Sequence, residues 1–243
     1  MEKLVRDEER NTTICQHFNE LQAWYPELTL CQNLFGEWVV RGPIQGSATY
    51  ENTDLDIVDV HVEIIVPTEY PEACPVTRET TGITKEFHTN SDGALCLGSP
   101  MAVKQTFSRN PTLLGYVENL VIPFFYAFFY KIRFGELPFG ELSHGGEGLL
   151  EYYLELFGIT ESSGVLGLLR ILVDDDYRGH LPCPCKSKAI VRNCHGKQLR
   201  EMTRLQLIND FTMDYCSIAK FCYEHSVPVP KECLPKQILK KLK

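Results

Sequence analysis

A cysteine, a histidine and an asparagine lie close together in the stretch EFHTNSDGALCLGSP, residues 86–100. Cys96 follows an Asp-Gly turn dipeptide on a piece of chain that ends in Gly-Ser-Pro, a context that favours a thiol near the surface. The residue types alone leave two interpretations open. One is a small buried thiol, the usual state of a free cysteine. The other is a nucleophile of the Cys-His protease type, with His88 as its base.

The chain that leads to Cys96, residues 68–96, is rich in turn residues and contains Pro71 and Pro75. Such a composition predicts a long irregular excursion over the surface. Long irregular segments of compact domains are disproportionately functional, so the excursion favours a site at Cys96.

A second group of reactive side chains has the pattern C-x-C, eight residues, then C-H, and consists of Cys183, Cys185, Cys194 and His195. Thiolates and imidazole are the natural ligands of a tetrahedral Zn²⁺ ion. The protein would fill all four positions, so the pattern predicts a structural ion that stabilises a segment with few large apolar side chains.

The same spacing resembles the SEC-C zinc motif, P-C-x-C-x8-C-H-G, a small module appended to many bacterial proteins. Pro182 and Gly196 match that motif as well. Lys186 and Lys188 stand where the motif usually has glycines.

The chain has an opening helix and a meander of strands, followed by the segments YPEACP, FHTN and GALCL. In this order, these features resemble those of the ubiquitin-conjugating enzyme family. The family pattern runs Y-P-x-x-P-P, H-P-N, then G-x-x-C-L. Thr89 replaces the family's proline, the interval from Asn90 to Cys96 is shorter than usual, and no W-S-P follows the cysteine. These departures fit divergent bacterial members. The matching residues are Tyr70, Pro71, Pro75, His88, Asn90, Gly93, Cys96 and Leu97.

The resemblance implies that Cys96 carries a ubiquitin-like modifier as a thioester and passes it to an amine of a target. A thiolate suits this role, because it is both a good nucleophile and a good leaving group. Asn90 would donate a hydrogen bond to the tetrahedral oxyanion. His88 would hold the loop, and Asp92 would form the turn or orient the incoming amine.

The resemblance also implies partners and a location. Divergent bacterial members are often encoded beside a ubiquitin-activating-like enzyme, a JAB-type peptidase and a ubiquitin-like modifier protein, frequently in antiviral systems. We therefore expect these partners and a cytoplasmic protein, since the charged start MEKLVRDEERNTT lacks the apolar core of a signal peptide.

Two other classes of function stay open. Noncatalytic relatives and RWD domains share the fold and would make this chain a protein-binding module, although they lack the cysteine. A nucleic-acid binder acting through the basic end is less favoured, because the last 13 residues contain no aromatic side chain.

Apolar periodicity predicts the elements that position these residues. We expect an opening helix over 8–24 and strands over 28–35, 37–42 and 56–67. No helix intervenes between the strands, which indicates an antiparallel meander and an α+β fold.

Helices are predicted after the meander as well. One follows Asn110 as a cap and Pro111, and includes the apolar run 120–130, which is too short for a bilayer and favours a buried helix over membrane association. Further helical patterns occupy 149–157 and 164–173. His144 lies between the helix that includes residues 120–130 and the helical pattern at 149–157. Its role stays open.

Charge divides the 243-residue chain into unlike parts. Residues 1–180 carry 12 basic and 27 acidic side chains, whereas residues 181–243 carry 12 basic and 5 acidic ones. We therefore predict a ubiquitin-conjugating-like (UBC-like) domain over 1–158, a connecting helix and acidic linker over 159–180, and a zinc-stapled helical module over 181–243. The ten cysteines, without a secretory signal, favour free thiols, metal ligands or catalysis over disulfides.

Overall fold

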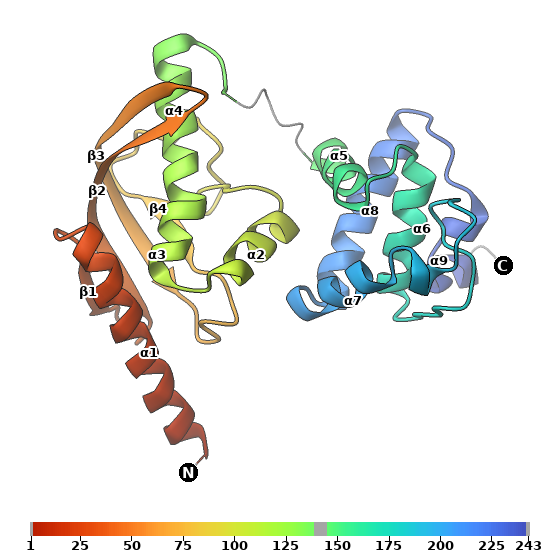
Figure 1. Ribbon diagram of the computed structural model, residues 1–243, viewed down its shortest axis with the longest axis horizontal. Coiled ribbons are helices and arrows are strands. Elements are labelled where there is room, and N and C mark those ends of the chain that lie inside the picture. The colour runs from red at the N-terminus through yellow and green to blue at the C-terminus, as the bar shows by residue number, and fades with distance from the viewer. Residues whose placement is uncertain (1, 139–144, 242–243) are drawn as a thin grey trace. The chain divides into compact units, whose positions relative to one another are not determined.

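The structure is a computed structural model that describes residues 2–138 and 145–241 (Figure 1). It divides into two compact units, residues 1–141 and 142–243. His144 lies outside the described residues.

The first unit is built on one antiparallel sheet of four strands in the order β1-β2-β3-β4. This confirms the predicted meander and the α+β class. Along β3, buried and exposed side chains largely alternate, as a sheet with one covered face requires. The strands are β1 (Thr29–Gln32), β2 (Trp38–Tyr50), β3 (Thr53–Val66) and β4 (Val76–Glu79).

Two features of the sheet were missed from the sequence. β2 continues to Tyr50, beyond the predicted end at residue 42, and pairs with β3 through a tight turn in which Glu51 and Asn52 both have positive φ. β4 lies inside the segment predicted to be irregular. Its four residues, VTRE, are too few to show a period of two, and pairing with β3 makes them a strand.

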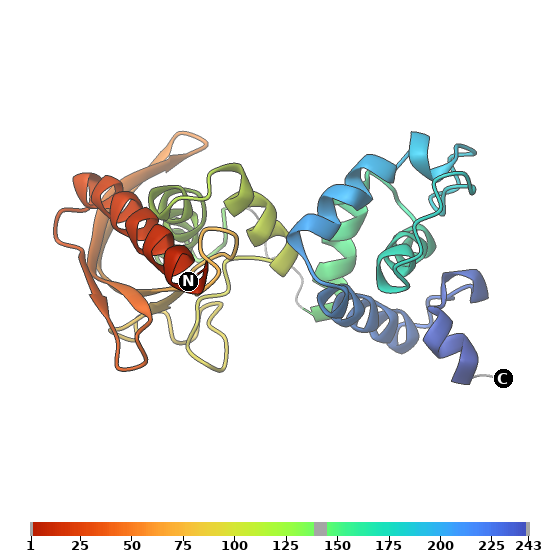
Figure 2. The same ribbon diagram turned by 90° about the horizontal axis from the view of Figure 1, so that it is seen from below.

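Helices cover one face of the sheet (Figures 1 and 2). α4 packs on β2 and β3, and α1 packs on α3. The apolar side chains of these helices and of the covered sheet face form one core, with Ile14, Val60 and Phe125 fully buried. The helices are α1 (Glu2–Trp24), α2 (Pro100–Arg109), α3 (Leu113–Tyr116), the π-helical turn η1 (Val117–Val121) and α4 (Ile122–Phe134).

The continuous helix Leu113–Phe134 is long and apolar enough to cross a membrane by length and composition alone. However, 56% of its most apolar window is buried inside the unit, which supports the interpretation as a core helix. A second candidate consists of α5 (Gly145–Phe157) and α6 (Ser162–Val173), which pass the same test only as a pair bent by 85°.

The predicted cap at Asn110 is wrong. The hydroxyl of Thr112 accepts a hydrogen bond from the backbone N–H of Gly115 at 2.9 Å, so Thr112 caps α3. Asn110 instead ends α2, a helix that the sequence analysis missed. The sequence does carry a signal for α2, because Ser99 caps it and Pro100 occupies its first turn.

The second unit is helical. α8 packs against both α5 and α6, and a buried carboxylate, Asp214, accepts hydrogen bonds from Tyr153 at 2.7 Å and Gln206 at 2.8 Å. The elements are α5 (Gly145–Phe157), α6 (Ser162–Val173), the 3₁₀ turn η2 (Val191–Asn193), α7 (Gly196–Leu205), α8 (Ile208–Glu224), η3 (Lys231–Cys233) and α9 (Lys236–Lys241).

This division differs from the predicted boundaries at 158 and 180. α5 belongs to the second unit because it packs on α8, and Gly146 permits the close approach, since a Cβ there would lie 2.2 Å from the carbonyl oxygen of Ser217. α6 is no linker either. Its residues Val165, Leu166 and Leu169 are fully buried in the second unit.

Candidate functional site

Cys96 lies on the second arm of a short hairpin that follows β4 in the chain. Its backbone N–H donates to the carbonyl oxygen of His88 at 2.7 Å, and the N–H of Asn90 donates to the carbonyl oxygen of Ala94 at 2.8 Å. Thr89 bridges to Leu95 between these two pairs. The register therefore places Cys96 opposite His88, and Asn90 diagonal to it, so the structure brings the three predicted residues onto one hairpin.

Asp92 and Gly93 form the tip of this hairpin, as predicted. Gly93 has a φ of 83°, and its N–H donates to the carbonyl oxygen of Asn90 at 2.9 Å. The Asp92 carboxylate accepts from the N–H of Ala94 at 3.1 Å. Asp92 thus stabilises the turn while its side chain remains exposed to solvent.

The hairpin is partly exposed. Ala94 and Leu95 are buried, Cys96 and His88 are half-buried, and Asn90 is exposed. The His88 ring packs edge-on against the buried Phe87 ring, with 4.7 Å between the ring centroids. This contact holds the His88 side chain next to the core. Cys96 is therefore not sealed in the interior.

A cavity of about 180 Å³ lies next to the Phe87 end of the hairpin. It is mostly apolar, and Cys96 is not one of its lining residues. They are Ile83, Glu86, Phe87, Phe128, Lys131 and Ile132.

Two polar residues that the sequence analysis did not single out stabilise the segment that leads into the hairpin. The Thr89 hydroxyl contacts the carbonyl oxygens of Thr84 at 2.8 Å and Phe87 at 3.1 Å, at the position of the family's proline. The Glu79 carboxylate accepts from the N–H of Gly82 at 2.7 Å and from Thr81. Burial acts to raise the pKa of Glu79, but these hydrogen bonds outweigh it and lower the pKa below its ordinary value.

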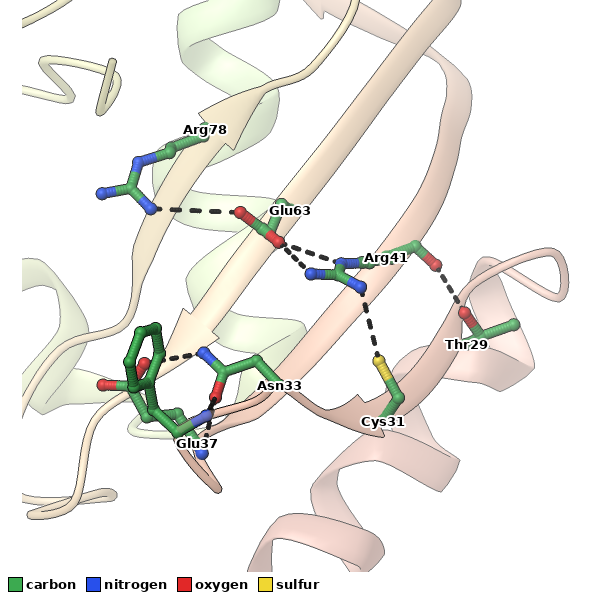
Figure 3. Close-up of polar contacts among 8 residues, drawn as sticks. Thr29, Cys31, Asn33, Glu37, Arg41, Glu63 and Arg78 are labelled. Atoms are coloured by element: carbon green, nitrogen blue, oxygen red, sulfur yellow. Dashed lines mark hydrogen bonds and ion pairs between the residues drawn. The ribbon is translucent and has the colours of Figure 1, made fainter. Parts of the chain in front are cut away.

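The uncovered face of the sheet carries a network of polar contacts (Figure 3). Arg41 donates to Glu63 at 2.9 Å through Nε, Arg78 lies 3.9 Å from the same carboxylate, and Cys31 lies 4.0 Å from Arg41. Arg78 also bridges to Ala94 through the backbone. This bridge joins the edge of the sheet to the hairpin of Cys96.

The predicted metal ligands converge in the second unit. The ligand atoms of Cys183, Cys185, Cys194 and His195 all lie within 4.8 Å of one another. Ligands at about 2.3 Å from a tetrahedral ion are separated by about 3.8 Å. His195 Nδ1 lies 3.2 Å from the sulfurs of Cys183 and Cys194, and the sulfurs of Cys185 and Cys194 lie 3.5 Å apart. The four residues can therefore hold one metal ion.

His195 is oriented for this role by α5. Its Nε2 lies 2.9 Å from the carbonyl oxygen of Phe157, which can only accept, so Nε2 carries the proton and Nδ1 keeps its lone pair for a metal. Among the thiols, burial raises the pKa of Cys183 to about 12. For Cys185, burial acts in the same direction, but hydrogen bonds from Ser187 and from the thiols of Cys183 and Cys194 outweigh it and lower the pKa to about 6.

The loop between the ligand pairs keeps the conformation that glycine would favour. Lys186 and Lys188 have φ values of 62° and 65°, in the left-handed region. The N–H of Cys183 donates to the carbonyl oxygen of Ala189 at 2.8 Å, which closes the loop. The two lysines thus occupy positions at which an L side chain is strained.

Lys188→Gly is therefore expected to stabilise the metal-loaded protein by about 0.5–1 kcal/mol, because glycine adopts positive φ without the clash of a Cβ. Urea denaturation of the second unit measures the change. Lys188→Ala is the matched control, since it removes the charge but keeps the Cβ and should bring no gain. Equal stabilisation by both variants would contradict the backbone explanation.

Comparison with known proteins assigns no family to this chain. No protein-family model, curated protein or solved structure matches it. The resemblances to ubiquitin-conjugating enzymes and to the SEC-C motif therefore rest on the motif residues alone.

Proposed function

We propose that the first unit is a ubiquitin-conjugating-like acyl transferase that carries a ubiquitin-like modifier as a thioester on Cys96. The observation that supports this most is the hairpin of residues 88–96, which brings Cys96, His88 and Asn90 together at a partly exposed position. The hairpin follows a four-stranded antiparallel meander in the chain, which agrees with the resemblance to ubiquitin-conjugating enzymes. Fold alone does not decide function.

In the loading step, the Cys96 thiol gives its proton to solvent. Its sulfur attacks the thioester carbonyl that joins the modifier to a ubiquitin-activating-like enzyme. A new C–S bond forms, and the thiolate of the activating enzyme leaves.

In the transfer step, an amine of the target attacks the carbonyl held by Cys96. The side-chain amide of Asn90 donates a hydrogen bond to the resulting oxyanion. The exposed carboxylate of Asp92 orients the amine and accepts its proton, and His88 holds the hairpin. Collapse of the intermediate releases the Cys96 thiolate and leaves an amide bond.

For the second unit we propose Zn²⁺ as the bound ion, because three sulfur ligands and one imidazole nitrogen suit this metal. Four protein ligands leave no open position, so the ion would stabilise the fold and take no part in the transfer. A JAB-type peptidase that removes the modifier, a bacterial cytoplasm and an antiviral setting complete the proposal by analogy with divergent family members.

The proposal is tested by incubating the protein with an activating enzyme, ATP and a candidate modifier, followed by a non-reducing gel. We expect an ATP-dependent adduct that dithiothreitol removes and that free lysine discharges. A modifier without its C-terminal carboxyl glycine is the control. The lack of any adduct with every ubiquitin-like modifier tested would favour the noncatalytic binding module instead.

Asn90→Ala is expected to slow discharge of the thioester to lysine by about 10²–10³-fold, because one oxyanion donor is lost. Loading should change little, and the hairpin should persist, since Asn90 joins it through backbone atoms. Single-turnover discharge measures the effect, with the exposed Asn209→Ala as the control. Discharge at the wild-type rate would remove Asn90 from the mechanism.

A further inference from the structure

The second unit carries a concentration of positive charge around the metal-binding loop. Residues 177–205 contain seven lysines and arginines but only one acidic residue, although the whole chain has a net charge of −8. A divalent ion held by three thiolates and a neutral imidazole adds a single negative charge, so the segment stays positive. All seven cationic side chains are exposed: Arg178, Lys186, Lys188, Arg192, Lys197, Arg200 and Arg204.

Four of these cations pair with no carboxylate within the described parts of the chain. They are Lys188, Arg192, Arg200 and Arg204. The other three lie 2.5–3.8 Å from carboxylates. Arg200 and Arg204 are one turn apart on α7 and share a face of that helix. Asp174, Asp175 and Asp176 come directly before this segment, and Asp176 pairs with Arg178 and Lys236. None of the three pairs with these four cations within the described residues, so the four remain available to an external anion.

An aromatic side chain lies within this surface. The Arg200 guanidinium lies over the Tyr177 ring, 5.5 Å from its centroid, and donates to the Tyr177 hydroxyl at 3.0 Å. A Cβ on Gly196 would lie only 2.4 Å from the Tyr177 hydroxyl oxygen. The start of α7 therefore packs closely against this hydroxyl. Tyr177 is still 39% exposed. The pair therefore forms a platform in which an accessible aromatic ring is held beside a guanidinium.

Arg192 lies beside Tyr177, since a Cβ on Gly179 would lie 3.0 Å from the Arg192 Cβ and 3.2 Å from the Tyr177 hydroxyl. We propose that Tyr177, Arg192, Arg200 and Arg204 form a binding surface for single-stranded nucleic acid. The arginines pair with the phosphates, and an unpaired base stacks on the platform of Arg200 and Tyr177. An acidic protein would use the charges but has no need of the stacking pair. The last 13 residues lack an aromatic side chain, but Tyr177 lies upstream of them. The proposal is independent of acyl transfer by Cys96.

The test uses the full-length, zinc-loaded protein and a fluorescein-labelled oligothymidylate of about 20 nucleotides, with anisotropy at roughly 50 and 200 mM salt. We expect binding at low salt that weakens at least tenfold at high salt. The triple variant Arg192→Gln, Arg200→Gln, Arg204→Gln should weaken it about tenfold or more and lower the slope of log affinity against log salt by about 2. The control triple variant Lys85→Gln, Arg109→Gln, Lys220→Gln removes exposed cations elsewhere and should bind as the wild type does.

A second pair of variants tests the platform. Tyr177→Leu should weaken binding at least about fivefold, whereas Tyr177→Phe, which keeps the ring, should not. Zinc content and circular dichroism verify that the variants fold. Absence of binding by the wild type, or equal weakening by both triple variants, would overturn the proposal. Displacement of the oligonucleotide by polyglutamate as readily as by unlabelled oligonucleotide would overturn it too and point to an acidic protein partner.

Discussion

Cys96→Ala is expected to abolish the thiol-labile adduct completely, because the hairpin of residues 88–96 carries no second thiol that could form a thioester. Cys96→Ser should form a more stable adduct, since an alkoxide is a much poorer leaving group than a thiolate. The serine ester should resist dithiothreitol but yield to hydroxide. A non-reducing gel run beside a reducing gel distinguishes the two variants.

Other cysteines of the first unit provide the controls. Burial raises the pKa of Cys74 to about 12, so near neutral pH this half-buried side chain is a thiol and a poor nucleophile. Cys15 is exposed on α1 and would report nonspecific acylation. Cys74→Ala and Cys15→Ala should both load as the wild type does. A thiol-labile adduct that survives in Cys96→Ala but disappears in Cys15→Ala would place the chemistry elsewhere.

Removal of the metal ligands is expected to have the largest effect on stability. The double variant Cys183→Ser, Cys194→Ser should bind no zinc, whereas the wild type should hold about one equivalent per chain. Metal binding contributes about 10 kcal/mol or more to the folding of small zinc modules. Loss of the metal should therefore disorder residues 181–205. It should also expose the end of α5, because the His195 ring is hydrogen-bonded to the carbonyl oxygen of Phe157 there.

Metal analysis and circular dichroism, with and without a chelator, measure this effect. Cys216→Ser is the matched control, since Cys216 is exposed on α8 and lies outside the cluster. The first unit should keep its own unfolding transition, because it is a separate compact unit. A double variant that melts like the wild type would show that the four residues do not hold a stabilising ion.

Local patterns could be predicted from the sequence. The alternation of Val60, Val62, Ile64 and Val66 indicated a half-covered strand, and all four are buried on the covered face. The four metal ligands are near one another in the sequence, so their spacing alone predicted their convergence. The Asp-Gly dipeptide likewise specified the hairpin turn, because its geometry depends on only four residues.

Features that depend on distant partners could not be predicted. β4 is a strand because β3 provides its hydrogen bonds, and Thr89 matters because its hydroxyl contacts backbone carbonyls across a turn. The domain boundary was misplaced because an apolar helix does not reveal which neighbour it packs on. α6 packs on α8, whereas the shift in charge that guided the prediction occurs after it.

The most direct measurement of the central claim is mass spectrometry of the loaded wild-type protein. The intact mass should rise by the mass of one modifier minus one water, and proteolysis at low pH should locate the added group on the peptide that contains Cys96. Treatment with hydroxylamine at neutral pH should restore the original mass. An adduct on a lysine, or an unchanged Cys96 peptide while the activating enzyme is fully charged, would contradict the account.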